Sequence, residues 1–124
     1  MEAALASAPP EAGGALLIDR DALAANWAEL ARKAAPAETG AVVKADGYGL
    51  GVGHVAPVLW RAGCRTYFVA LAAEGVALRR LLPDARIFVL AGAMPGTAAT
   101  FSCSSSFAQN SVDFRPVFAM FGKR

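Results

Sequence analysis

Three short apolar runs, separated by segments of helical pattern, limit what this chain can fold into. The runs occupy residues 41–44, 66–70 and 86–90, and each is rich in β-branched or aromatic side chains. Their apolar character is nearly continuous rather than alternating, which is typical of strands that are buried on both faces of a parallel sheet. We therefore predict three parallel strands connected by helices.

The segments between the runs carry apolar residues at helical spacing. One stripe is closed by Gly63 and consists of Val55, Val58, Leu59 and Ala62. A second is closed by Pro83 and consists of Leu78, Leu81 and Leu82. Glycine and proline are common helix terminators, so both stripes predict helices that end at these positions.

An additional helix is expected before the first run. Leu23, Trp27 and Leu30 have helical spacing, and Asp21 is in the position of an N-cap. Pro36 predicts the end of this helix. Residues 15–18 form another short apolar run that could be a strand.

Alternation of strands and helices about every 20 residues is a βα repeat, which suits a doubly wound sheet or the start of a (β/α)8 barrel. A complete barrel needs about 250 residues, and this chain has 124. The predicted fold class is therefore α/β, a partial (β/α)8 barrel with the first βα units only and an irregular C-terminal tail.

The two ends of the chain differ from its centre. Residues 1–14 are rich in alanine, proline and glycine and are predicted to be a flexible extension. Residues 1–100 contain one serine, whereas residues 101–124 contain five and continue no βα pattern. We interpret this break as a reading-frame change followed by early termination, with a naturally short protein as the alternative. The gene sequence would decide between them.

Composition excludes several classes of protein. The chain is 56% hydrophobic, 18% charged and has a net charge of +2, without the basic cluster of a nucleic-acid-binding protein. The N-terminus lacks the pattern of a signal peptide, and no apolar stretch is long enough to span a membrane. Cys64 and Cys103 show no metal-ligand spacing. A cytoplasmic protein without metal, nucleic-acid or membrane partners is expected.

Lys44 is the most informative candidate for chemistry. It ends an apolar strand and precedes a glycine-rich turn at residues 46–51. Catalytic residues of βα barrels lie at the carboxyl ends of strands, and a partly desolvated lysine there can act as a Schiff-base nucleophile. From spacing alone, a surface lysine in a loop is the alternative. The glycines match neither a dinucleotide-binding nor a P-loop pattern.

Three neighbouring residues have weaker signals. Tyr48 could bind a phosphate group or pack beside the strand end. His54 has no acidic partner in the sequence pattern and is left out of the site. Glu74 opens a helix, where a carboxylate suits the positive end of the helix dipole.

The segment AVVKADGYGLG at residues 41–51 closely resembles the pyridoxal-phosphate attachment motif of alanine racemases. The flanking sequence agrees with the family's opening pattern at Asp19, Leu23 and Asn26. Residues 68–70 with Glu74, and then residues 89–92, resemble its second and third strands. The resemblance covers residues 15–100, which would be the N-terminal part of the cofactor-binding barrel.

The resemblance implies roles for three residues. Lys44 would hold pyridoxal 5'-phosphate as an internal aldimine and act as an acid and base, Tyr48 would contact the cofactor phosphate, and Leu90 would line the cofactor pocket. The family's arginine at the pyridine nitrogen, and the opposing tyrosine from the partner subunit of its homodimer, have no counterpart in residues 101–124.

The function implied by the resemblance is the interconversion of L-alanine and D-alanine, which supplies D-alanine for peptidoglycan. Two alternatives remain open. The chain could be a truncated, non-catalytic remnant of such an enzyme, or it could derive from a related pyridoxal-phosphate barrel enzyme that acts on another amino acid. An activity assay on the purified chain separates the first alternative from an active enzyme.

Overall fold

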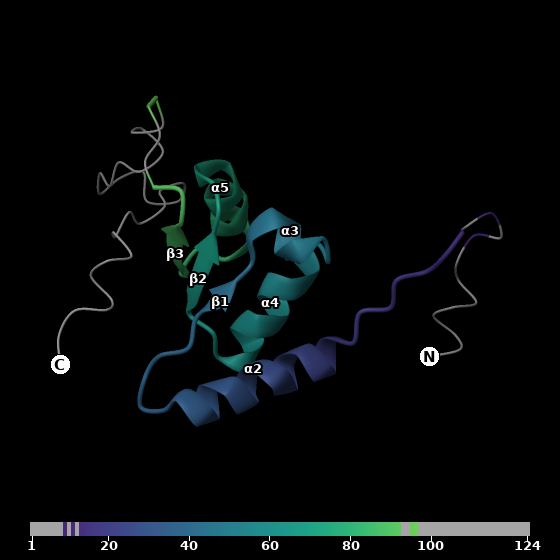
Figure 1. The fold of residues 1–124 in the computed structure, drawn as a ribbon, viewed down its shortest axis with the longest axis horizontal. Coiled ribbons are helices and arrows are strands. Elements are labelled where there is room, and N and C mark those ends of the chain that lie inside the picture. Colours follow the sequence, from purple (N-terminus) through teal and green to yellow (C-terminus); the bar gives the residue numbers. More distant parts are fainter. Residues whose placement is uncertain (1–8, 10, 12, 93–94, 97–124) are drawn as a thin grey trace.

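Strands and helices alternate along the chain as the apolar pattern predicts. The computed structural model describes residues 9, 11, 13–92 and 95–96. Its elements, shown in Figure 1, are α2 (Arg20–Ala34), β1 (Ala41–Val42), α3 (Lys44–Tyr48), α4 (Val52–Ala62), β2 (Thr66–Val69), α5 (Ala72–Leu81) and β3 (Arg86–Val89). The strands are one to two residues shorter than predicted, and the predicted α/β class is confirmed.

The three strands form a parallel sheet in the order β1-β2-β3. Val42 is opposite Phe68, and Phe68 is opposite Phe88. The carboxyl ends of all three strands therefore lie at one edge of the sheet, the edge at which residues 43–52 connect β1 to α4.

The hydrophobic core lies between the sheet and the helices α4 and α5, which pack on the same face (Figure 1). Its fully buried side chains include Tyr67 on β2, Ile87 on β3 and Leu78 on α5. Helix α2 packs on α4 from outside, where Trp27 contacts the core. The nearly continuous apolar runs of β2 and β3 agree with this burial, because all their residues except Phe68 and Arg86 are buried.

The opposite face of the sheet is less covered. Val42 is 45% exposed and Leu90, just after β3, is 44% exposed. The rings of Phe68 and Phe88 stack on this face with centroids 5.3 Å apart. In a closed (β/α)8 barrel this face is the interior, which is filled by layers of side chains.

The predicted helix ends are confirmed, but two details of the prediction at the N-terminal end were wrong. The N-cap of α2 is Asp19, whose Oδ1 accepts hydrogen bonds from the backbone N–H groups of Asp21 (3.0 Å) and Ala22 (2.9 Å). Asp21 lies within the first turn, where it faces the positive end of the helix dipole. Residues 15–18 form no strand, because no neighbouring strand pairs with them within the described residues and Leu16 is 71% exposed.

Some predictions fall on parts of the chain that the structure does not describe. The serine-rich tail at residues 101–124, together with Cys103, lies outside the described residues, as does most of the N-terminal extension. Within the described residues, no helix combines the length and the apolar character that crossing a membrane requires.

Candidate active site at the carboxyl ends of the strands

Lys44 lies where the chain leaves the sheet. The backbone N–H of Val43 donates to the carbonyl oxygen of Phe68 (2.9 Å), so pairing with β2 continues to the residue before the lysine. Lys44 is half-buried, and its Nζ is 5.9 Å from the centroid of the Tyr48 ring. The structure thus places the predicted lysine at the carboxyl end of β1 and brings the predicted tyrosine beside it.

The segment after Lys44 is a single left-handed turn, although its length and hydrogen bonds resemble a short helix. Ala45, Asp46 and Gly47 have φ values of 51°, 54° and 65°, and Tyr48 follows at 56°. Two i to i−4 hydrogen bonds close the turn, from Gly47 to Val43 and from Gly49 to Ala45. Left-handed backbone costs about 1–2 kcal/mol for each residue other than glycine, so surrounding contacts must hold this turn.

Two carboxylates supply such contacts. Oδ1 of Asp46 accepts a hydrogen bond from the N–H of Val52 (2.7 Å), the first residue of α4, and so joins the turn to the start of this helix. Oε1 of Glu74, from α5, accepts one from the N–H of Ala45 (2.7 Å). The sequence pattern placed Glu74 at a helix start and the family resemblance matched it after the second strand, but neither indicated a contact 29 residues away.

Leu90 lies at the same edge of the sheet, two strands away from the lysine. Its N–H donates to the carbonyl oxygen of Val69 (2.8 Å), which extends the pairing of β2 and β3 by one residue. Continuing the strand register places Lys44, Ala70 and Leu90 at one level. Tyr48 is 63% exposed, so its phenol is accessible from solvent. The three predicted site residues therefore share one edge of the fold.

An apolar cavity of about 190 Å³ lies beneath the left-handed turn. It is lined by Val43, Asp46, Val52, Val69, Glu74 and Ala77. Both carboxylates that hold the turn thus border a space with mostly apolar walls.

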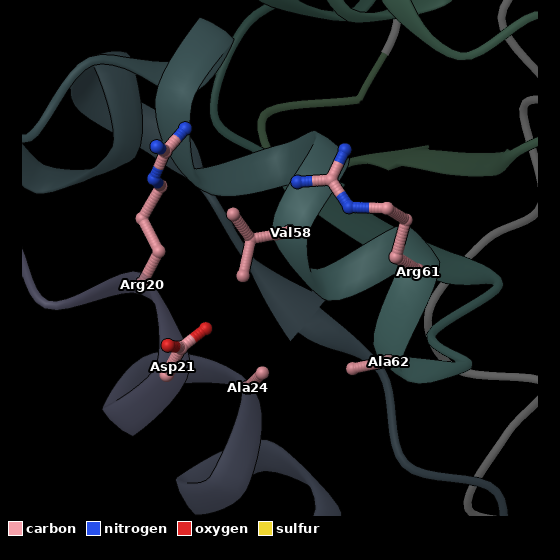
Figure 2. A pocket seen from close by; sticks show the side chains of 6 residues that line it. All are labelled: Arg20, Asp21, Ala24, Val58, Arg61 and Ala62. Atoms are coloured by element: carbon pink, nitrogen blue, oxygen red, sulfur yellow. The ribbon is translucent and has the colours of Figure 1, made fainter.

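A larger hollow of about 440 Å³ lies between α2 and α4, away from the strand ends. Figure 2 shows Arg20 and Asp21 of α2 on one side and Val58 and Arg61 of α4 on the other. None of the predicted site residues lines it. Size alone therefore does not identify the site, and the chemistry points to the strand ends.

The ionisable groups in the core have structural roles. Burial raises the pKa of the Cys64 thiol, which therefore stays protonated. Burial also raises the pKa of Tyr67, whose hydroxyl donates to the carbonyl oxygen of Ala56 (3.2 Å). Among the described residues, no three His, Cys, Asp or Glu side chains come together as a metal site would require.

Comparison with known sequences agrees with this geometry. The family model of the alanine racemase N-terminal domain matches residues 18–104. An alanine racemase of Methylobacterium nodulans is 50% identical over 105 residues, which are 85% of this chain and 26% of that protein. An alanine racemase of Brucella ovis is 54% identical over 89 residues, which are 71% of this chain and 22% of that protein.

Comparison with solved structures supports the same fold. The alanine racemase of Bartonella henselae, solved with covalently bound pyridoxal phosphate, matches with a TM-score of 0.64 and 44% identity over 66% of this chain and 23% of that one. The alanine racemase of Corynebacterium glutamicum matches with a TM-score of 0.61 and 33% identity over 78% of this chain and 27% of that one. The predicted partial (β/α)8 barrel is confirmed by these matches.

This chain spans about a quarter of the length of the relatives that it matches. The family model nevertheless covers more than half of the chain, and it includes every helix and strand that the structure describes. The chain therefore belongs to the family of alanine racemase N-terminal domains.

Proposed function

We propose that this chain carries the cofactor-binding lysine for the pyridoxal-phosphate-dependent interconversion of L-alanine and D-alanine. One observation carries the proposal. The half-buried residue Lys44 lies at the carboxyl end of β1, with its Nζ 5.9 Å from the centroid of the Tyr48 ring, in a chain whose relatives are alanine racemases. D-alanine made in this way would serve the synthesis of peptidoglycan.

The residues at the strand ends fit pyridoxal phosphate chemically. A primary amine is required to bind the aldehyde of the cofactor, and Lys44 supplies it. The exposed phenol of Tyr48 supplies a hydrogen-bond donor for the phosphate, and the exposed side chain of Leu90 supplies an apolar surface for the ring. When bound, the cofactor serves as an electron sink for a carbanion at the substrate's α-carbon.

The roles of the chain's own residues follow from their positions. Lys44 would bind the cofactor and, when its Nζ is released by the incoming amino acid, would accept or return the proton of the α-carbon. Tyr48 would orient the phosphate, and Leu90 would exclude water from one side of the pocket. A homodimer that acts on alanine in the cytoplasm is the expected assembly.

A second candidate is that the chain binds no substrate by itself. Val42 and Leu90 are more than two-fifths exposed on the face that is the interior of a closed barrel. β1 and β3 each pair with one strand only within the described residues. A fragment with these features would hold the lysine motif without the walls of a substrate pocket.

Reductive trapping of the cofactor tests the proposal directly. The purified chain is incubated with pyridoxal phosphate and sodium borohydride, and the modified lysine is located by peptide mass spectrometry. The chain has three lysines, and exposed Lys33, which pairs with Glu29 on α2, is the matched control. We expect labelling mainly at Lys44, unchanged labelling there in Lys33→Ala, and its loss in Lys44→Ala. Equal labelling of Lys33 and Lys44 would contradict a built lysine site.

An assay of racemisation then distinguishes the candidates. The assay measures production of D-alanine from L-alanine and, in parallel, racemisation of a panel of other L-amino acids. It shows whether the chain is active and which amino acid it accepts as substrate. Labelling at Lys44 without racemisation of any amino acid would favour the non-catalytic candidate. Racemisation of a different amino acid would favour a related enzyme.

A further inference from the structure

We propose that Glu74 is a positioning residue that fixes the place of the Lys44 amine by joining the left-handed turn to the end of β2. The inference rests on the proposed function, because it assigns Glu74 a role toward the same lysine. The carboxylate of Glu74 accepts its hydrogen bonds from backbone N–H groups, so it would act on the lysine through the turn.

The carboxylate of Glu74 bonds two segments that are far apart in the sequence. Oε1 accepts from the N–H of Ala45 at 2.7 Å, immediately after Lys44. Oε2 accepts from the N–H groups of Ala70 at 2.7 Å and of Leu71 at 3.1 Å, at the end of β2. One side chain on α5 therefore joins the residue after the lysine to the neighbouring strand.

Only part of this arrangement is needed to begin a helix. A glutamate at the third position of a helix commonly reaches back to the N-cap N–H, as Glu74 does with Leu71. The N-cap residue is leucine, whose side chain has no acceptor, so the reciprocal half of a capping box is absent. The bond to Ala45 lies outside this motif, and a role in capping α5 does not account for it.

The bond to Ala45 falls where the backbone most needs support. Ala45 is the first residue of the left-handed turn, with φ of 51°. The i to i−4 bonds of the turn come from Gly47 and Gly49, so the Ala45 N–H takes its partner from Glu74 instead. Loss of that partner would leave the N–H to solvent and release the turn that directs Lys44.

A carboxylate is required because three N–H donors converge on it. Each of its two oxygens accepts at least one bond, and hydrogen bonds to a charged acceptor are stronger than neutral ones. An amide of the same size has a single acceptor oxygen, and its NH₂ group would face an N–H donor. Glu74→Gln can therefore serve Ala45 or the end of β2 but not both. Within the described residues Glu74 forms no salt bridge, so its carboxylate joins the turn to the end of β2 through these N–H groups.

Amide hydrogen exchange and cofactor trapping together test the inference. In Glu74→Gln, NMR should show exchange of the Ala45 N–H faster by about tenfold, the effect of losing one charge-assisted hydrogen bond, while amides of β3 keep their protection. Reductive trapping of pyridoxal phosphate at Lys44 should slow by a similar factor relative to Lys33. Glu11→Gln removes an exposed carboxylate before α2, away from both lysines in the sequence, and should change neither readout.

The outcomes separate this inference from the proposed function. A folded Glu74→Gln chain that keeps both the Ala45 protection and the ratio of Lys44 to Lys33 trapping would overturn it. If that variant does not fold, Glu74→Asp, which is one methylene shorter, is judged by the same two criteria. Loss of folding in both variants would show a general structural role and also overturn it. Absence of Lys44 trapping in the unmodified chain would reject the proposed function, while the exchange data would still test whether Glu74 holds the Ala45 N–H.

Discussion

Substitution of Asp46 tests whether the left-handed turn is held by side-chain contacts. Asp46 has φ of 54° and ψ of 48°, and its Oδ1 accepts the N–H of Val52 at 2.7 Å. Asp46→Ala removes this acceptor and leaves the N–H of Val52, the first residue of α4, without it. It also places alanine in a backbone region that aspartate and asparagine occupy more readily than other residues with a side chain.

The expected cost of Asp46→Ala is the sum of these two effects. Loss of the hydrogen bond to Val52 costs about 1 kcal/mol, and the poorer fit of alanine to left-handed backbone adds about 0.5–1 kcal/mol. The free energy of unfolding should therefore fall by about 1.5–2 kcal/mol. Asp46→Asn keeps an acceptor oxygen and the tolerance of left-handed backbone, and it loses only a charge near a helix N-terminus, which is worth about 0.5 kcal/mol.

Equilibrium unfolding in urea measures both variants. The midpoint should shift in Asp46→Ala while the slope stays constant, because the surface exposed on unfolding does not change. Trapping of pyridoxal phosphate at Lys44 should slow in the same variant. An asparagine variant as unstable as the alanine variant would show that neither the hydrogen bond to Val52 nor the backbone preference matters, and the reasoning would be refuted.

Two further substitutions test contacts away from the site. Tyr67→Phe removes the buried hydrogen bond to Ala56 at 3.2 Å and should lower the free energy of unfolding by about 1 kcal/mol. If urea unfolding shows a decrease of more than about 3 kcal/mol, the packing of the core has also changed. Hydrogen bonds from the Thr66 hydroxyl and from Arg86 lower the pKa of the Glu38 carboxyl. The ionised carboxylate therefore stabilises the fold above about pH 4.3, and this contribution is lost as the pH falls through the pKa of the folded state. The free energy of unfolding of Glu38→Gln should be lower than that of the unmodified chain by less than about 1 kcal/mol at pH 7, since solvent screens this half-exposed group. The difference should shrink when unfolding is measured at acid pH. A difference that grows below pH 4 would contradict this sign.

Most of the fold could be predicted because its signals are local. Burial of β2 and β3 explains their nearly continuous apolar runs, and the helices ended where Pro36, Gly63 and Pro83 indicated. The two errors arose where local signals compete. Two aspartates lie two residues apart near the start of α2, and only the backbone conformation shows that Asp19 is the cap. The apolar run at residues 15–18 has no strand beside it in the described part of the fold.

The candidate site was predictable in part for the same reason. Lys44 and Tyr48 are four residues apart, so a short loop brings them together whatever else the chain does. Leu90 joined the prediction only through the family resemblance, and its cofactor role stays a prediction, as do those of Lys44 and Tyr48. The limits of the N-terminal extension and of the serine-rich tail also stay predictions.

The sequence by itself determined the elements, their parallel arrangement and the place of Lys44 at a strand end, because apolar periodicity and helix terminators act over a few residues. Only the tertiary structure decided how the lysine is held. Ala45 and Asp46 adopt left-handed backbone that their own preferences oppose, and the support comes from Glu74, 29 residues away. Such a contact depends on the packing of α5 beside the strand ends, and a local pattern cannot encode it because the donor and the acceptor meet only in the folded chain.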